Sequence, residues 1–370
     1  MNRVSGADPP MLSTPDRTRA TPDRFTEVFF KIIAACVGLL AGLAGLEAGV
    51  RLLGIAPQAE AEYGNNLADP QILYRPTPFS RAAGRNSTNE FDYDYRHNSL
   101  GFRDVEHVSP KPTGTFRILG LGDSFTYGAG VPFEEIYLSR LEAMLNHRTG
   151  AHPRVEIIKA GIPRYFPQTE RLLLEQYGPH FQPDLVTVAF LPNDVIDTFM
   201  GMDAVTVDPS GFLVTREAQE LGPWAVKAYE HCQFCRILLK HYVDRRIAEK
   251  YPFRTDDVFR PGGFHEGDWI AIENEYARMK SIASSMGARF MILHIPQKGP
   301  WTEREHYPGV RLSSWAKANK VGFVDVLPSM ENASPGERLY YTKDGHCTPA
   351  GHRVIAQELY SYLTGQNLIP

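Results

Sequence analysis

The sequence predicts an α/β protein: a three-layer α/β/α fold with a parallel sheet of about five strands, preceded by an N-terminal transmembrane helix. Three observations support this prediction. Beyond about residue 115, short continuous apolar runs alternate with amphipathic stretches, a pattern typical of parallel strands covered by helices on both faces. Glycine or polar residues suited to chemistry directly follow three of these runs. A long apolar stretch lies near the N-terminus.

The N-terminal stretch has the features of a membrane anchor. Residues 1–28, rich in Pro, Thr, Asp and Arg at their start, are expected to form a disordered cytoplasmic tail, and residues 29–55 a transmembrane signal anchor. Ile32–Leu53 is long enough to cross a bilayer. The basic residues lie mainly before it, so the positive-inside rule places the following domain in the periplasm or outside the cell. A cleaved signal peptide and a buried amphipathic helix are the alternatives.

Composition limits the classes of partner. A net charge of -4 over 370 residues does not indicate a nucleic-acid partner. No zinc-finger spacing, Walker-type loop or dinucleotide-binding loop is present, so neither a cofactor nor a metal ion is expected. Cys232 and Cys235 form a Cys-x-x-Cys that could be a disulfide, half of a metal site or two core residues. No second cysteine pair completes a zinc site.

Between the anchor and the sheet, residues 56–114 are expected to form a stalk and an edge segment. Phe91–Asp104 alternates aromatic and polar residues, which predicts an edge hairpin turning at Asn98–Gly101. The domain of residues 115–370 has an expected insertion at about 199–267, because the strand–helix alternation breaks there. The insertion is predicted to hold a hairpin over 204–215, one or two helices over 224–250 and a loop, and to form a lid or side wall.

The remaining elements of this domain alternate. The expected strands are Phe116–Leu121, Val155–Lys159, Leu185–Leu191, Phe290–Ile295 and Val321–Val326. The expected helices are Glu134–His147, Thr169–Gln176, Ile272–Met286, Val310–Asn319 and Ala350–Leu363. Ligands of such folds bind at the carboxyl ends of the strands, where Ser124, Gly161 and Asn193 are expected to lie.

Ser124 is the candidate nucleophile. It follows the first strand in the tripeptide Gly122-Asp123-Ser124, and Gly122 permits a sharp turn because it has no Cβ. A serine on such a turn lies beside free backbone N–H groups that can hold an oxyanion. Asp and Ser are also ordinary helix-capping residues, so this tripeptide alone is equally compatible with a plain turn.

Gly161 and Asn193 are candidate oxyanion donors, together with the backbone N–H of Ser124. Gly161, directly after the second strand, allows a backbone N–H to approach a ligand closely. Asn193 ends the most apolar run, and its side chain offers an N–H donor of fixed direction. Each residue alone also fits an ordinary turn after a strand.

Asp344 and His346 are the candidate acid–base pair, just before the last helix. A loop that holds the two side chains together can present the imidazole to a serine while the carboxylate fixes its tautomer. Thr348 and Pro349 would also begin the helix well, and His352 inside it is expected to be structural.

Taken together, these four blocks resemble the SGNH/GDSL hydrolase superfamily of esterases and acyltransferases. Gly122-Asp123-Ser124-Phe125, Gly161, Asn193, and Asp344 with His346 occur in the order of that family across residues 116–363. The resemblance implies a flavodoxin-like SGNH fold, with Ser124, Asp344 and His346 as the catalytic triad and with Ser124, Gly161 and Asn193 as the oxyanion hole.

The anchor and the segment Asn98–Arg103 are similar to the membrane-anchored bacterial branch of this family. Two departures from the common pattern stand out. Asp344 precedes His346 by two residues instead of three, a spacing frequent in the anchored and acyltransferase-like branches, and Pro192 replaces a frequent glycine.

Three functions remain open from the sequence. The first is a serine esterase acting on an acyl or acetyl ester of a lipid or cell-envelope glycan. The second is an O-acyltransferase that passes the acyl group to a saccharide with the same triad. The third is a non-catalytic envelope protein that binds glycans. Aromatic residues of the insertion region are expected to line a sugar or acyl pocket, or to pack in the core: Trp224, Tyr229, Phe234 and Trp269.

Overall fold

A computed structural model describes residues 24–56, 65–86, 88–148, 152–208, 211–250, 255–334 and 336–370. The chain divides into two compact units, residues 1–56 and residues 57–370. The expected tail falls largely on residues 1–23, which lie outside the described residues, as do residues 57–64 of the expected stalk.

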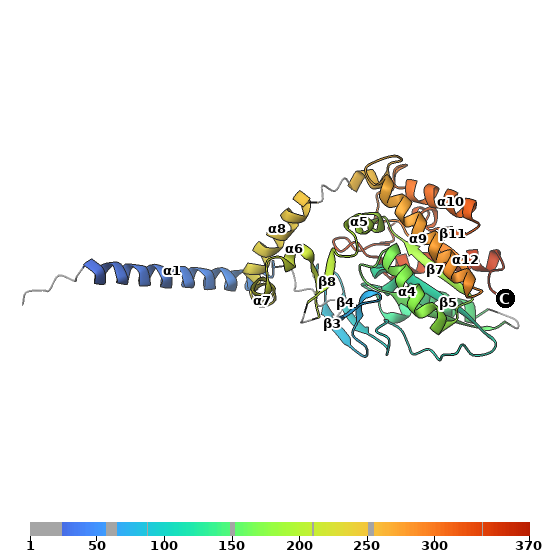
Figure 1. Cartoon of the computed structure of the whole chain (residues 1–370), viewed down its shortest axis with the longest axis horizontal. Helices are drawn as coiled ribbons and strands as arrows, with labels where there is room; N and C mark the ends of the chain where they lie inside the picture. The colour runs from blue at the N-terminus through green and yellow to red at the C-terminus, as the bar shows by residue number, and fades with distance from the viewer. Residues whose placement is uncertain are drawn as a thin grey trace, which may run out of the picture. The chain divides into compact units, whose positions relative to one another are not determined.

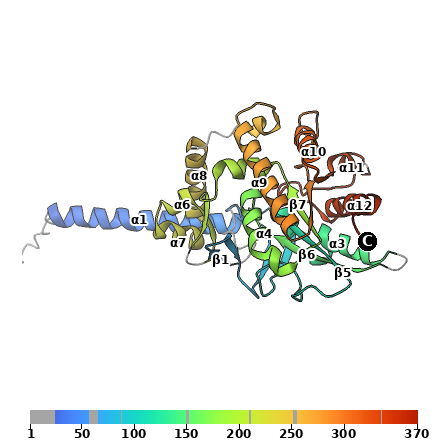
Figure 2. The ribbon, with the colours of Figure 1, turned by 45° about the vertical axis from the view of Figure 1, so that its right-hand side comes forward.

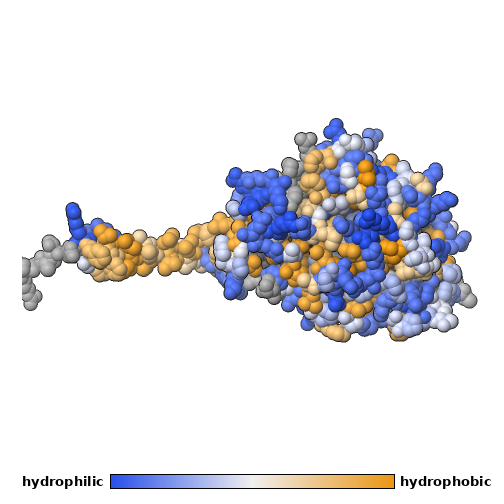
Figure 3. Space-filling view, in the orientation of Figure 1, coloured by the Kyte–Doolittle hydropathy of each residue, from blue (hydrophilic) through white to orange (hydrophobic). Residues whose placement is uncertain are grey.

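The described part of the first unit contains one helix, α1 (Arg24–Leu53), which is long and apolar enough to cross a membrane. Its large apolar side chains, among them Phe29, Val37 and Leu40, are exposed along its length, as the surface colouring shows (Figure 3). Glu47 and Arg51 form an ion pair at 2.6 Å between Arg51 Nε and Glu47 Oε1. The predicted apolar helix is therefore present, and it is a candidate transmembrane helix; a signal sequence would meet the same criteria.

The second unit is built on a parallel sheet of five strands. In chain order these are β5 (Thr115–Gly122), β6 (Arg154–Gly161), β7 (Leu185–Phe190), β10 (Arg289–His294) and β11 (Gly322–Asp325). Their order across the sheet is β11-β10-β7-β5-β6, and every neighbouring pair is parallel (Figure 1). Read from the other edge, this is the 2-1-3-4-5 order of flavodoxin-like folds. The predicted fold class is confirmed.

Helices cover both faces of the sheet because the strand side chains alternate between two apolar cores. Leu119, Leu121 and Val188 point into one core, beneath α4 (Pro167–Phe181), α9 (Glu266–Ser285) and α10 (Tyr307–Asn319). Ile118 and Ile157 point into the other, beneath α3 (Tyr137–Asn146), α11 (Leu327–Glu331) and α12 (Pro349–Gly365). Figure 2 shows α4 and α9 on one side of the strands and α3 and α12 on the other.

The segment before the sheet differs from the expected stalk. It contains two antiparallel pairs, β1 (Asn66–Asp69) with β2 (Leu73–Pro76) and β3 (Arg81–Arg85) with β4 (Asp92–Arg96). The predicted hairpin over 91–104 is wrong in its pairing, because β4 pairs with β3 before it and not with the chain after Asn98. Ile72 and Tyr74 are fully buried, so this segment packs into the second unit instead of extending as a linker.

The expected insertion region contains a hairpin followed by helices. The hairpin pairs β8 (Val205–Val207) with β9 (Leu213–Thr215), and residues 209–210 of its turn lie outside the described residues. Three helices follow, α6 (Arg216–Gln219), α7 (Pro223–His231) and α8 (Gln233–Lys250), and then the short 3-10 helix η2 (Thr255–Phe259). Cys232 and Cys235 form a disulfide at the junction of α7 and α8.

Candidate active site

Ser124 is the first residue of a four-residue helix, α2 (Ser124–Tyr127), which directly follows β5. Asp123 caps this helix, since its Oδ1 accepts a hydrogen bond of 2.9 Å from the backbone N–H of Phe125. The first N–H groups of a helix have no partner within it. Ser124 therefore lies at the carboxyl end of the sheet, partly accessible, on the turn that the sequence predicts.

Two glycines allow α2 to lie close against the strand ends. A Cβ on Gly122 would lie 2.0 Å from Thr126 Oγ1, and one on Gly161 would lie 2.2 Å from the backbone nitrogen of Tyr127. Ile162 N–H donates to Gly122 C=O at 3.0 Å. Because successive strand N–H groups alternate in direction, the N–H of Gly161 faces away from β5, on the free edge of the sheet. Gly161 is thus required by the packing of α2, a reason that the sequence analysis did not identify.

His346 and Asp344 reach Ser124 from the loop before α12. His346 Nε2 lies 2.8 Å from Ser124 Oγ, and His346 Nδ1 lies 2.5 Å from Asp344 Oδ1. The ring of Phe125 packs beside the imidazole, with 4.9 Å between ring centroids. Burial alone would raise the pKa of Asp344, but its hydrogen bond and charge interaction with His346 hold that pKa below its usual value. Asp344 is therefore ionised at neutral pH and can fix the imidazole.

The Asp344 loop is held by residues that sequence reasoning missed. Glu90 accepts three hydrogen bonds of 2.8 Å from the backbone N–H groups of Thr342, Lys343 and Asp344. Asn86 Nδ2 donates to Asp344 Oδ2 at 3.2 Å. Both residues lie in the turn between β3 and β4, more than 250 positions earlier in the chain. No local sequence pattern identifies them, because only the tertiary fold brings the two loops together.

Arg103 is a second support that sequence reasoning did not assign. Its buried guanidinium donates to the carbonyl oxygens of Tyr127, at the end of α2, and of Gly128 and Val131, which follow it. It also lies over the ring of Tyr95, 4.2 Å from the centroid. The expected edge segment therefore fixes the far end of the nucleophile turn.

Asn193 begins α5 (Asn193–Met200), a helix that the sequence analysis did not predict. Its Nδ2 donates to Asp123 Oδ2 and to Asp197 Oδ2, both at 3.2 Å. Both amide protons therefore have carboxylate acceptors, and Asn193 is exposed enough for one of them to turn toward a ligand. Burial raises the pKa of Asp197 to about 6, against the opposing effects of Arg164 and of the hydrogen bond from Asn193.

Two buried carboxyl groups lie behind this site. Glu170 on α4 and Asp194 on α5 are almost fully buried. Burial raises the pKa of Glu170 well above its usual value, with a further contribution from the charge of Asp123. Burial also raises the pKa of Asp194, and the charges of Glu170 and Asp123 add to the rise. Burial therefore disfavours a negative charge on either group.

His352 and Trp269, which the sequence analysis singled out, are buried, and so is Cys347. His352 is buried, and its Nδ1 accepts a hydrogen bond from Tyr137 N–H at 3.2 Å. Cys347 is a free, buried thiol whose pKa burial raises. Trp269 lies in the core, where its indole N–H donates to Val258 C=O at 3.0 Å, whereas Trp224 is exposed. Across the described parts of the chain, no group of three or more His, Cys, Asp or Glu side chains could hold a metal ion.

Comparisons with known proteins find distant likenesses to solved structures. No protein-family model matches the chain, and no curated protein sequence matches it. TesA matches at 14% identity and a TM-score of 0.41, covering 67% of this chain and 98% of that chain. A lipolytic protein of the G-D-S-L family from Veillonella parvula matches at 12% identity and 0.39, covering 67% and 98%. A GDSL-like lipase from Bacteroides thetaiotaomicron matches at 15% and 0.37, covering 70% and 93%.

The second and third of these proteins carry the name of the GDSL group, which the four sequence blocks resemble.

Proposed function

We propose that this protein is a serine hydrolase of the SGNH/GDSL type that cleaves ester bonds through an acyl-enzyme on Ser124. Two hydrogen-bond distances carry the proposal. Ser124 Oγ lies 2.8 Å from His346 Nε2, and His346 Nδ1 lies 2.5 Å from Asp344 Oδ1. A serine hydroxyl becomes a useful nucleophile when an adjacent base removes its proton and a third group orients that base.

The reaction follows in two halves. Ser124 Oγ forms a bond to the ester carbonyl carbon as its proton passes to His346 Nε2. The bond to the alcohol oxygen then breaks, and His346 returns the proton to the departing alcohol. Water attacks the acyl-enzyme in the second half, again losing a proton to His346, and the acid leaves as Ser124 recovers its hydrogen. Asp344 stabilises the imidazolium that forms in each half.

The oxyanion is held by three N–H groups in this proposal: the backbone N–H of Ser124, the backbone N–H of Gly161 and the side-chain amide of Asn193. Support comes from the position of Ser124 at the start of α2 and from the close packing of Gly161 against that helix. Asn193 must release one of its two carboxylate acceptors, and Asp197 is the one outside the nucleophile block. Donors of this kind stabilise the charge that develops in the transition state.

The proposed location is a single-pass membrane protein with a cytoplasmic N-terminus and a periplasmic or extracellular catalytic domain. Support comes from α1, from the excess of basic residues before it and from the Cys232–Cys235 disulfide, which suits an oxidising compartment. Its substrates in that place are esters of lipids or of envelope saccharides.

Fluorophosphonate labelling of the full chain, beside its Ser124→Ala variant, tests the proposal. We expect the parent to be labelled and to hydrolyse p-nitrophenyl acetate, and Ser124→Ala to do neither. A folded parent that is neither labelled nor active would contradict the proposal and favour a binding role for the cleft. In an active parent, adding a saccharide separates two acceptors of the acyl group: an acyltransferase acylates the sugar, whereas a hydrolase releases free acid only.

A further inference from the structure

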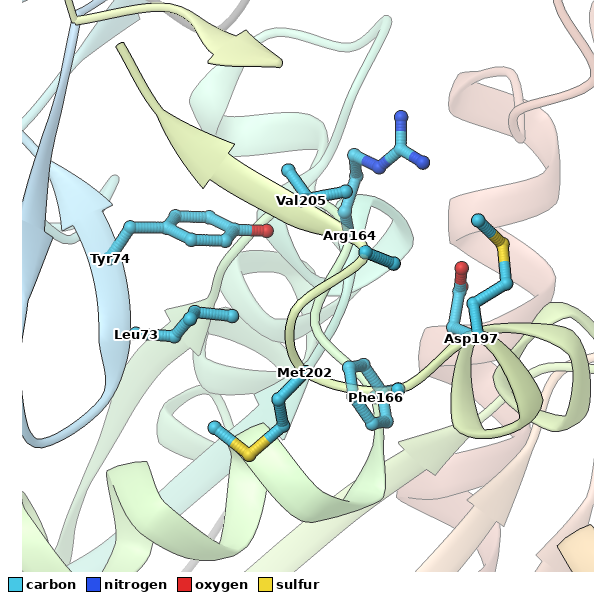
Figure 4. Close-up of a pocket in the computed structure, with 10 residues that line it drawn as sticks. Leu73, Tyr74, Arg164, Phe166, Asp197, Met202 and Val205 are labelled. Carbon is cyan, nitrogen blue, oxygen red and sulfur yellow. The ribbon is translucent and has the colours of Figure 1, made fainter. Parts of the chain in front are cut away.

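The expected insertion is attached at its base to the first strands of the second unit. The backbone N–H of Asn66, which begins β1, donates to Gly211 C=O in the turn of the β8–β9 hairpin at 2.8 Å. Val205 of β8 lines a small cavity of about 20 Å³ together with Tyr74 of β2 and with Phe166 (Figure 4). The hairpin is therefore fixed to the segment before the sheet, and the helices α6 to α8 follow directly after it.

Helix α8 has apolar side chains on two different faces. Leu239, Val243 and Ile247 recur every four residues and line a cavity of about 290 Å³ between this helix and the hairpin. Leu238 and Tyr242 are also four residues apart, but they are turned by about 100° from that stripe, since each precedes a stripe residue by one position. Their exposed fractions are 55% and 46%. This second face is therefore not covered by the rest of its unit.

Phe234, Leu238 and Tyr242 together form the outward stripe of α8. Phe234 lies one turn before Leu238 and is half-buried. Trp224, in the first turn of the neighbouring helix α7, is 65% exposed, which fits neither the pocket nor the core position that the sequence left open for it. Trp and Tyr combine an apolar ring with a polar N–H or O–H group, a combination that suits the boundary between lipid and water.

The charge of the two helices is opposite in sign to that of the whole chain. Residues 223–250 contain six Lys and Arg residues and three Asp and Glu residues, whereas the formal net charge of the chain is -4. Arg245 lies seven positions after Leu238, and so on the same face of α8, where it pairs with Glu249. Anionic phospholipid headgroups attract a surface with an excess of basic residues. Exposed aromatic and basic residues on one helix are typical of helices that lie on a membrane surface.

The chain itself brings a bilayer within reach of this surface. Residues 57–64 separate the last described residue of the first unit from the first described residue of the second. The nine peptide steps from residue 56 to residue 65 span at most about 32 Å in any conformation. A bilayer that α1 crosses is thus covalently tied to the strand that bonds the insertion hairpin, whereas a soluble partner must arrive from solution.

We infer that the outward stripe of α8, together with Trp224, docks on the surface of the anionic phospholipid bilayer that α1 crosses. The inference rests on the proposed membrane location and adds a second contact with the same bilayer. Such a contact restricts how far the second unit can swing about its linker. It involves none of the residues of the proposed triad or oxyanion hole, so the esterase activity plays no part in its test.

Depth-dependent quenching tests the inference on the full chain, with one protein in each nanodisc of phosphatidylcholine and phosphatidylglycerol. A fluorescent NBD label is attached to a cysteine, and one lipid carries a doxyl quencher on its acyl chain near the headgroup. A label on Tyr242→Cys in a Cys36→Ser background should lose about half of its fluorescence, because interfacial helices lie about 5–10 Å into the headgroup boundary. The matched control is Val310→Cys in the same background, which should not be quenched, since Val310 is 63% exposed on α10, apart from α8 (Figure 1).

Cys36 of the parent is the internal reference, because it is exposed within α1 while Cys347 is buried and the other two cysteines form a disulfide. We expect its label to be quenched. Quenching at Cys36 without quenching at position 242, or equal quenching at positions 242 and 310, would overturn the inference and leave the proposed location standing. Absence of quenching at Cys36 would overturn the proposed location, and with it the inference.

Hydrogen exchange of the unlabelled chain is a second measurement that needs no new cysteine. Backbone amides of residues 233–250 should exchange at least about threefold more slowly in discs with phosphatidylglycerol than in discs of phosphatidylcholine alone, because the basic surface is attracted to anionic lipid. Leu238→Glu should abolish this difference, whereas Val310→Glu should retain it. Equal exchange of the parent in both kinds of disc would overturn the inference. So would protection that appears only in detergent at high protein concentration, which would identify a second copy of the chain as the occupant.

Discussion

Two Asp–His pairs lie at the carboxyl edge of the same sheet. In both, the aspartate contacts the imidazole Nδ1, but the hydrogen-bond partner of Nε2 differs. In one, Asp344 holds His346 Nδ1, and His346 Nε2 lies 2.8 Å from Ser124 Oγ. In the other, Asp325 Oδ1 lies 2.8 Å from His294 Nδ1, but His294 is fully buried. Its Nε2 has no hydrogen-bond partner within the described structure.

The two pairs are also held differently. His294 and Asp325 are the last residues of the adjacent strands β10 and β11 and are partners in their register, so the sheet itself brings them together. His346 and Asp344 lie in one loop, which depends on Glu90 and Asn86 for its position. The comparison teaches that an Asp–His pair is not a catalytic element by itself. Such a pair also needs a nucleophile beside Nε2 and access for substrate. The loop before α12 provides both for His346, whereas the buried ends of β10 and β11 provide neither for His294.

Replacing each histidine tests the comparison most directly. We expect His346→Ala to lower kcat on p-nitrophenyl acetate by about 10⁴-fold or more, because Ser124 loses its base. His294→Ala should retain kcat per folded molecule and instead lose about 1–3 kcal/mol of unfolding free energy through the buried space it leaves. Steady-state kinetics and thermal unfolding of both variants give the two readings. A large loss of kcat in folded His294→Ala would mean that the second pair also serves catalysis.

Replacing each aspartate by asparagine should give the next largest effect. Asp344→Asn keeps the shape of the side chain but no longer stabilises the imidazolium or fixes its tautomer, so kcat should fall by about 10²–10⁴-fold. Asp325→Asn is the matched control, and its kcat should stay within about twofold of the parent. Equal activity of Asp344→Asn and the parent would show that a backbone carbonyl or water orients His346 instead.

The sequence was sufficient to predict the sheet, and it also predicts where the candidate site residues lie along it, because both depend on local patterns. Apolar runs mark buried strands, and Ser124, Gly161 and Asn193 lie at or just beyond the ends of three of them. Since all parallel strands end at one edge, residues that follow them are brought together by topology alone. Asp344 and His346 could be assigned only because the four blocks together resemble a known family.

The parts that sequence reasoning missed depend on long-range pairing. The alternation of Phe91–Arg96 indicates a strand, but it does not say that its partner is Arg81–Arg85. The hydrogen bonds from the Asp344 loop to Glu90 join residues 252 to 254 positions apart. Arg103 is an ordinary charged residue in sequence, and only its burial beside the end of α2 reveals its role.

Replacing Glu90 tests the Asp344–His346 pair through its supporting loop, without changing either side chain of the pair. Glu90→Gln keeps the size of the side chain but provides one acceptor oxygen for three backbone N–H groups, so the Asp344 loop should become less well positioned. We expect kcat to fall about tenfold with KM little changed, because small misplacements of catalytic groups are costly. Glu249→Gln, on the exposed side of α8, is the control for loss of a surface carboxylate. Unchanged kcat in Glu90→Gln would show that the loop is held without Glu90.

Acid unfolding should give the smallest of these effects and should again separate the two pairs. Burial alone would raise the pKa of Asp325, but the hydrogen bond and charge of His294 hold it below its usual value of 3.8. A carboxyl group with a lowered pKa contributes stability that is present above its unfolded-state pKa and is lost as pH falls through its folded-state pKa. The parent should therefore lose this contribution on acidification below about pH 4. Asp325→Asn lacks it at every pH, so the difference in Tm between the two proteins should narrow from pH 6 to pH 3.

Asp344→Asn, in a more accessible loop, should show a smaller difference in Tm at pH 6. A difference for Asp325→Asn that stays constant from pH 6 to pH 3 would mean that the ionised Asp325 carboxylate contributes nothing to stability through His294.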